Sequence, residues 1–94
     1  MDLEWDEAKD AENQRKHGLS LADAARLDWA RGLPRRDTRY NYGEVRYILI
    51  APLGGRLHVC VYVLGPKARR IISLRKANLR ERRSYAEAFP SPVD

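Results

Sequence analysis

Three strand-like runs joined by very short connections constrain the fold more than any other feature of this 94-residue chain. Residues 44–52 (EVRYILIAP), 56–64 (RLHVCVYVL) and 69–74 (RRIISL) are rich in β-branched and aromatic side chains, which favour strands. An LGG turn at 53–55 links the first two runs, and a Gly-Pro pair at 65–66 marks the next turn. Because short connections join antiparallel neighbours, the sequence predicts a three-stranded antiparallel meander.

Two helices are predicted before the meander. Asp6 is placed to cap a helix N-terminus and Gly18 suits the left-handed position that ends a helix, so the first helix is expected at 6–17. Acidic residues early in this helix and basic residues late in it agree with the helix dipole. Ser20 starts the second helix, which the helical spacing of apolar residues extends over 20–29.

The remaining segments complete an α+β fold. Good helix formers occupy 77–89, before Pro90 and Pro92. The polar connection 31–43 has room for a short edge strand at 38–42. The expected architecture is therefore two N-terminal helices, an antiparallel sheet of three to four strands and a C-terminal helix.

The length of the chain limits the number of domains, and the distribution of charge indicates the kind of partner. The chain is long enough for one domain only, which we expect at 1–94. Residues 1–30 hold eight acidic and four basic residues, whereas 31–94 hold fourteen basic and five acidic residues. This asymmetry favours an acidic partner, most commonly nucleic acid, although a basic face that only maintains solubility is the alternative. With Cys60 as the single cysteine, and no signal peptide or long apolar span, we expect a cytoplasmic protein.

Metal chemistry has little support in the sequence. His58 and Cys60 fall on one face of a predicted strand, but a closed zinc site needs four ligands and the only other histidine is His17. Two half-buried strand residues are the simpler interpretation of this pair. We therefore expect neither a metal site nor a cofactor.

The arginine-rich stretch 69–85 carries the better candidates for chemistry. RNA cleavage through the 2′-hydroxyl needs a base, an acid and cations that hold the phosphate. Arginine suits the last task because its planar fork pairs with two phosphate oxygens. Helical spacing groups Asn78, Glu81 and Tyr85 on one side, and strand alternation groups Arg69, Ile71, Ser73 and Arg75 on one face, with Arg70, Ile72 and Leu74 on the other.

Plainer roles are also open for these side chains. A solvent-exposed glutamate is the commoner case for Glu81, and Ser73 has strand neighbours to which it can bond. The ring of Tyr85 can pack on the sheet. His17 can serve only as a cation at the end of the first helix.

Six stretches in order along the chain resemble a single family. They are EWDEAK (4–9), Asn13 with KHGLS (16–20), DAA (23–25), DTRYNYGEVRY (37–47), RIISLRKA (70–77) and the ER-x-x-Y pattern of Glu81, Arg82 and Tyr85. Together they resemble the BrnT toxins of bacterial type II toxin–antitoxin systems, which are small ribonucleases with a RelE-like fold.

The resemblance implies a metal-independent endoribonuclease that cleaves RNA and inhibits growth. It also implies a BrnA-type antitoxin with a ribbon-helix-helix part, a heterotetramer that represses its operon through antitoxin-bound operator DNA, and no membrane association. A non-catalytic nucleic-acid-binding module or co-repressor is the alternative. By position, the resemblance assigns phosphate binding to three arginines, with three further residues in support: Arg46, Arg70 and Arg75, supported by Lys76, Ser73 and Arg69. It assigns the role of base to Glu81, or alternatively to His17. Tyr85 would orient the substrate or donate a proton.

Overall fold

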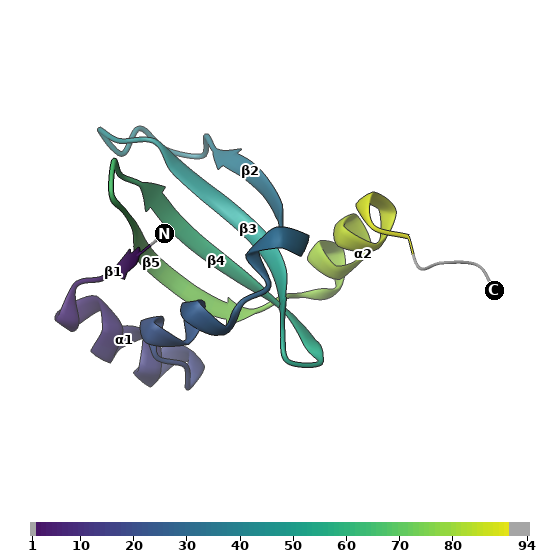
Figure 1. The fold of residues 1–94 in the computed structure, drawn as a ribbon, viewed down its shortest axis with the longest axis horizontal. Helices are drawn as coiled ribbons and strands as arrows, with labels where there is room; N and C mark the ends of the chain where they lie inside the picture. Colours follow the sequence, from purple (N-terminus) through teal and green to yellow (C-terminus); the bar gives the residue numbers. More distant parts are fainter. Residues whose placement is uncertain (1, 91–94) are drawn as a thin grey trace.

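A five-stranded sheet forms the centre of the structure (Figure 1). The computed structural model describes residues 2–90, so Met1 and 91–94, which include Pro92, lie outside the described residues. The α+β class and the C-terminal helix are confirmed. In spatial order the strands are β1 (Asp2–Glu4), β5 (Ala68–Lys76), β4 (Arg56–Leu64), β3 (Arg46–Leu53) and β2 (Leu33–Asp37).

The predicted meander is confirmed as β3, β4 and β5. Leu53 pairs with Arg56, so only two glycines lie in the turn between β3 and β4. Gly54 has a φ of +63°, which is the left-handed conformation that glycine adopts without steric cost. β5 continues to Lys76, beyond its predicted end at residue 74.

Both edge strands differ from the prediction. The sheet is not wholly antiparallel, because β1 pairs in parallel with β5, Leu3 lying opposite Arg69. Three residues with two charges carry no detectable periodicity, so β1 could not be recognised locally. The edge strand expected at 38–42 lies earlier, as β2, where Pro34 suits an edge because it lacks one backbone donor.

The first predicted helix is confirmed as α1 (Glu7–His17). The side chain of Asp6 accepts a bond from the Lys9 amide, and Gly18 ends the helix with a φ of +70°. These are the two caps that the sequence predicted.

The prediction of a single second helix at 20–29 was wrong. Two short 3₁₀ helices occupy this region, η1 (Leu21–Arg26) and η2 (Trp29–Arg31). Leu27 between them is extended and 5% exposed, and the Asp28 amide donates to the carbonyl of Pro52 at 2.8 Å. The helix therefore stops at Leu27, because the Leu27 side chain is buried in the core and the Asp28 backbone bonds to β3.

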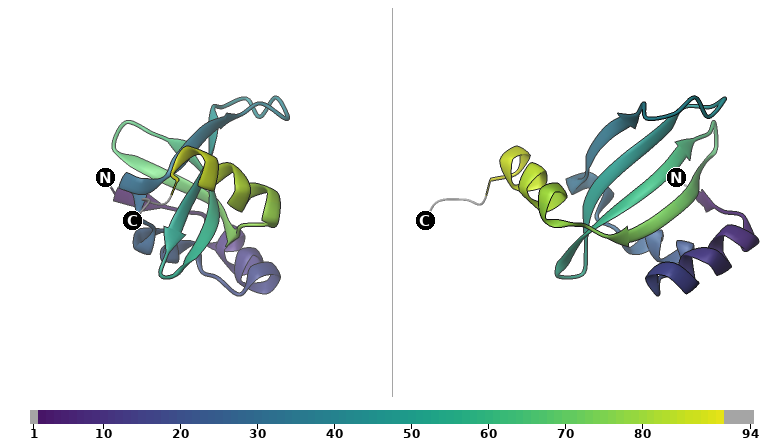
Figure 2. Two further views of the ribbon diagram at one scale, coloured as in Figure 1. Left: turned by 90° about the vertical axis from the view of Figure 1, so that its right-hand side faces the viewer. Right: turned by 180° about the vertical axis from the view of Figure 1, so that it is seen from behind.

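The C-terminal helix α2 (Leu79–Ala88) begins two residues later than predicted, with Asn78 as its N-cap. It lies at one end of the sheet and projects beyond it (Figures 1 and 2). Tyr85 is its buried residue. The ring packs in a small core with Ile48, Ile50, Val59 and Ala77.

The two faces of the sheet are covered unequally, as the opposite views in Figures 1 and 2 show. On one face, here called the covered face, α1, η1 and η2 enclose the main core. On the other, here called the open face, α2 covers one end only. The main core contains Leu21, Ala24, Leu27, Leu49, Ala51, Leu53, Cys60, Tyr62, Ile71 and Leu74.

A bulge in β5 decides which of its side chains reach the open face. Val61 of β4 pairs with Ser73, but the next residue, Tyr62, pairs with Ile71, so Ile72 has no partner in β4. An extra residue shifts the alternation by one, which sends the following side chains to the opposite face.

The predicted alternation along β5 was therefore wrong. Arg69 and Ile71 lie on the covered face, where Ile71 belongs to the main core with Leu74. Arg70, Ser73 and Arg75 pair with Val63, Val61 and Val59, whose side chains alternate onto the open face. The bulge thus places on one face three polar side chains that strict alternation would have divided.

A buried amide joins α1 to β5. Asn13 is 5% exposed, and its Nδ2 donates to the carbonyls of Leu19 at 2.8 Å and Leu74 at 2.9 Å. Its Oδ1 accepts from the Leu74 amide at 3.0 Å. The side chain of Asn13 therefore hydrogen-bonds the backbone of β5 at Leu74, where the short strand β1 no longer pairs with it.

Replacement of this amide should destabilise the whole domain. We expect Asn13→Ala to lower the free energy of unfolding by about 2 kcal/mol, because buried backbone groups lose their partners. Gln14→Ala, on the exposed side of the same helix, is the matched control and should change stability little. Urea unfolding measures both, and an equal effect of the two substitutions would contradict the role of Asn13.

Candidate functional site

One carboxylate holds two arginines from different strands at the open face. Glu44 accepts from Arg46 Nε at 3.1 Å and from Arg70 Nη2 at 2.5 Å. Val63 of β4 pairs with both arginines, so Glu44 spans the intervening strand. Hydrogen bonding from Arg70, followed by that from Arg46, lowers the pKa of Glu44 below its ordinary value. Two positive charges thus share one negative charge here.

A second carboxylate holds a third arginine of the open face. Arg75 Nη1 and Nη2 donate to Glu81 Oε1 and Oε2 at 2.8 and 2.7 Å. Glu81 Oε1 also accepts from the Asn78 amide at 2.8 Å, and the Asn78 side chain accepts from the Glu81 amide at 2.9 Å. This is a capping box at the start of α2.

These bonds make Glu81 a weak proton acceptor. Its side chain is 15% exposed. Hydrogen bonding from Arg75 is the largest cause that lowers the pKa of Glu81, and the bond from the Asn78 amide lowers it further. Oε1 accepts two bonds and Oε2 accepts one, so only one lone pair, on Oε2, is left for a proton from a substrate. This geometry supports a structural and positioning role for Glu81 more than the role of base.

Two adjoining hollows lie between α1 and β5. One, of about 190 Å³, is lined by His17 and Ser73 among others. The next, of about 200 Å³, is lined by Arg46 and Arg70. Lys9 and Ile72 line both hollows, so the two are neighbours, and together they are here called the track beside β5. The structure therefore brings four of the predicted site residues, His17, Ser73, Arg46 and Arg70, to a single region.

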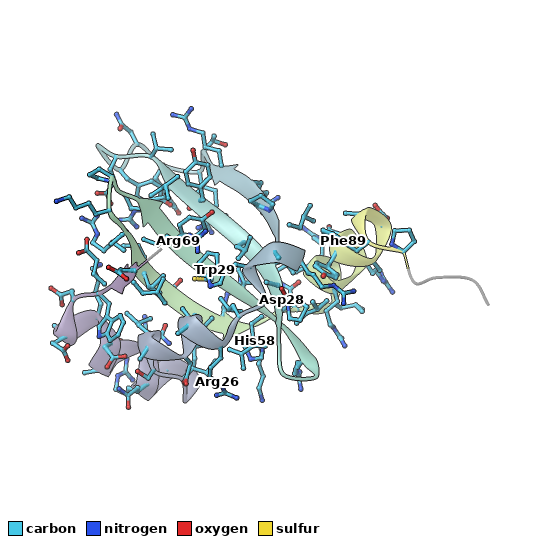
Figure 3. The ribbon with its side chains drawn as sticks, viewed as in Figure 1. Arg26, Asp28, Trp29, His58, Arg69 and Phe89 are labelled. Atoms are coloured by element: carbon cyan, nitrogen blue, oxygen red, sulfur yellow. The ribbon has the colours of Figure 1, made fainter. Side chains whose placement is uncertain are left out.

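Three other predicted site residues lie elsewhere. Tyr85 is buried, and its hydroxyl donates to the carbonyl of Arg31 at 2.7 Å, so it does not share an exposed side with Glu81. Lys76 follows Arg75 and points to the covered face, opposite His58. Arg69 lies on the covered face with its guanidinium 4.0 Å from the ring centroid of Trp29, and Figure 3 shows the two side chains together.

The end of β2 and the loop that follows it contain functional candidates that the sequence did not single out. Asp37 has a side chain that is 1% exposed. It accepts from Arg39 Nε and Nη2 at 2.9 and 2.8 Å and from the Tyr42 hydroxyl at 3.0 Å. These bonds, led by those from Arg39, hold the pKa of Asp37 well below its usual range. The signal that could have found them was their common position in the run 37–47, because the partners lie only two and five residues from Asp37, whereas the burial of Asp37 depends on the fold.

Within residues 2–90, no group of three or more His, Cys, Asp or Glu side chains is placed to hold a metal ion. No helix of the described part of the chain is long and apolar enough to cross a membrane.

Known proteins share both the sequence pattern and the fold. The family model of the ribonuclease toxin BrnT of type II toxin–antitoxin systems matches residues 5–81. The crystal structure of the Brucella abortus ribonuclease toxin BrnT is similar at 26% identity and a TM-score of 0.63, over 83% of this chain and 97% of that chain. No curated protein matches the chain. The range matched by the family model contains His17, Arg70 and Glu81 but not Tyr85.

Acid should weaken the domain partly through Glu81. Because the pKa of Glu81 is lowered by folding, its contribution to stability is present above its ordinary value of 4.5 and is lost as the pH falls through the folded-state pKa. Glu81→Gln keeps a capping side chain but removes the charge. We expect it to lower the free energy of unfolding by about 1 kcal/mol at pH 7 and by progressively less towards pH 3.

Chemical unfolding at a series of pH values measures this difference. Glu87→Gln, on the exposed surface of the same helix, is the control and should follow the parent at every pH. A difference between Glu81→Gln and the parent that stays constant from pH 7 to pH 3 would contradict the assignment.

Proposed function

The chain belongs to the BrnT family of ribonuclease toxins of type II toxin–antitoxin systems, and we propose that it is a metal-independent endoribonuclease whose active site is the track beside β5. One observation carries this proposal. An imidazole and two guanidinium groups line adjoining hollows that share Lys9 and Ile72. A base and a phosphate-binding pair are thereby available within one region of the surface.

Arg46 and Arg70 are the phosphate-binding residues in this proposal. They share Glu44 as a partner, so the cluster keeps a net positive charge and unused N–H donors. A phosphate that approaches can take up these donors in the bidentate manner that guanidinium favours. Ser73 adds a hydroxyl donor on the same face.

His17 is the proposed base. Imidazole is the side chain most often used for general acid–base catalysis, and His17 is exposed in the hollow that it shares with Ser73. Glu81, our first choice from the sequence, is engaged by Arg75 and by the cap of α2. We therefore assign Arg75 and Glu81 to the positioning of α2 and of the adjacent strand.

The reaction follows from these assignments. His17 takes the proton of a ribose 2′-hydroxyl, and the resulting oxygen attacks the adjacent phosphorus. The bond from phosphorus to the 5′ oxygen breaks, and Lys9, which lines both hollows, protonates the leaving oxygen. Arg46 and Arg70 stabilise the charge that builds on the phosphate. The products are a 2′,3′-cyclic phosphate and a free 5′-hydroxyl.

The partner is proposed from the same family membership. Type II systems pair a toxin with an antitoxin protein, and we propose a BrnA-type antitoxin with a ribbon-helix-helix part that forms a heterotetramer and represses the operon. A cytoplasmic location belongs to this proposal, because RNA and operator DNA are there. Light scattering of the co-purified complex measures its mass, and a mass of one toxin plus one antitoxin would overturn the heterotetramer.

Cleavage should not depend on a divalent metal. Since His17 and the arginines supply the base and the charge, we expect purified protein to cut RNA in excess EDTA and to leave 2′,3′-cyclic phosphate or 3′-phosphate ends. Mass spectrometry of the fragments identifies the ends. Complete loss of cleavage in EDTA with recovery in magnesium would refute this mechanism.

Substitutions should separate the base from the positioning residues. We expect His17→Gln and Arg70→Ala each to lower the cleavage rate by about a hundredfold. Glu81→Gln should stay within about tenfold of the parent, because it loses only a positioning contact of about 1 kcal/mol. Arg83→Ala, exposed on α2, is the control for a simple loss of charge.

Single-turnover cleavage and a thermal melt of each variant provide the measurements. A fully folded Glu81→Gln that is as inactive as His17→Gln would return the role of base to Glu81. A parent protein that binds RNA but never cuts it would indicate a binding module instead of a nuclease.

A further inference from the structure

An aromatic side chain stands exposed on the loop next to the proposed active site. Tyr40, between β2 and β3, is 71% exposed, more than any other large hydrophobic side chain among residues 2–90. A single exposed tyrosine is ordinary on a protein surface. Its significance comes from the contacts that connect Tyr40, through Tyr42, to the charged cluster.

The ring of Tyr40 rests on a partner that is held in place. It meets Tyr42 edge-to-face, with ring centroids 5.7 Å apart and an interplanar angle of 74°. Tyr42 is fixed by its hydroxyl, which donates to Asp37 at 3.0 Å. Its ring is held by the guanidinium of Arg46, 4.2 Å from the centroid. The ring of Tyr40 therefore packs on a tyrosine that is itself held in place, and most of its own surface is exposed to solvent.

This support leads directly to the proposed phosphate-binding residues. The Arg46 side chain that contacts Tyr42 also bonds Glu44, which in turn bonds Arg70. Tyr40, Tyr42 and Glu44 are among the residues that line a hollow of about 270 Å³. A short series of contacts thus connects the ring of Tyr40 to the guanidinium groups of Arg46 and Arg70.

We propose that Tyr40 stacks an unpaired nucleobase of RNA whose neighbouring phosphate is bound by Arg46 and Arg70. The inference rests on the proposed function and adds the class of substrate. Every base has a π-face, so stacking on an aromatic ring tolerates any sequence. It requires a base whose face is free, which a duplex does not offer. Tyr40 therefore makes the protein selective for single-stranded segments.

Binding can be measured separately from cutting. The probe is a single-stranded oligoribonucleotide with 2′-O-methyl groups throughout, which lacks the attacking hydroxyl, and one 2-aminopurine whose fluorescence falls on stacking. We expect Tyr40→Ala to weaken binding about 5- to 150-fold and to abolish the quenching. Tyr40→Phe should bind and quench like the parent, because stacking needs the ring and not the hydroxyl.

A second exposed aromatic supplies the matched control. Phe89 is 37% exposed and stacks on Tyr85 at 4.7 Å, at the far end of α2 (Figure 3). Phe89→Ala should leave RNA binding and quenching unchanged. The same probe annealed to its complement should bind the parent and Tyr40→Ala equally, because the duplex leaves no base free.

The outcomes separate this inference from the nuclease mechanism. Tyr40→Ala that binds the single strand as tightly as the parent overturns the stacking role, and the cleavage defect of Arg70→Ala would still stand. The inference also fails if the parent does not bind the modified probe while cutting ordinary RNA. A Tyr40→Ala variant that loses affinity only for the antitoxin would assign the ring to that protein interface instead.

Discussion

The bulge at Ile72 fixes the positions of the arginines in β5, and the proposed site depends on those positions. Without the unpaired residue, Arg70 would share a face with the core side chain of Leu74. With it, Arg70 lies beside Ser73 on the open face, while Arg69 packs on Trp29. An insertion of one residue in a strand is a local irregularity, yet here it determines which cations can contact one substrate.

Three guanidinium groups of the open face, those of Arg46, Arg70 and Arg75, are bound to carboxylates in the free protein. Glu44 holds Arg46 and Arg70, and Glu81 holds Arg75. Such pairing reduces the freedom of long side chains before a ligand arrives, so less entropy is lost on binding. It also means that a phosphate must compete with Glu44 for the same donors. Glu44 therefore holds the guanidinium groups of Arg46 and Arg70 in position but weakens their attraction for a phosphate.

Local sequence signals predicted part of the fold correctly. They failed for elements whose conformation depends on residues far away in the sequence. The caps Asp6 and Gly18 and the turn at Gly54 act within a few residues, so α1 and the meander could be predicted. The 3₁₀ segments depend on burial of Leu27, and the bulge depends on pairing with β4, neither of which has a local pattern. Residue types identified Arg46, Arg70 and His17 as candidates, but the sequence could not reveal that Glu81 is occupied or that Tyr85 is buried.

The long-range contacts of β5 also affect when the protein can become active during its own synthesis. β1 needs Ala68 to Arg70 as its partner, and Asn13 needs Leu74, 61 residues later. The N-terminal third of a growing chain therefore lacks the strand that completes its packing, and contacts this distant in sequence form late in folding. His17 is made early, but it faces Ser73 and the arginine cluster only once β5 has emerged from the ribosome. A nascent chain thus cannot assemble the proposed site until nearly all of it has been translated.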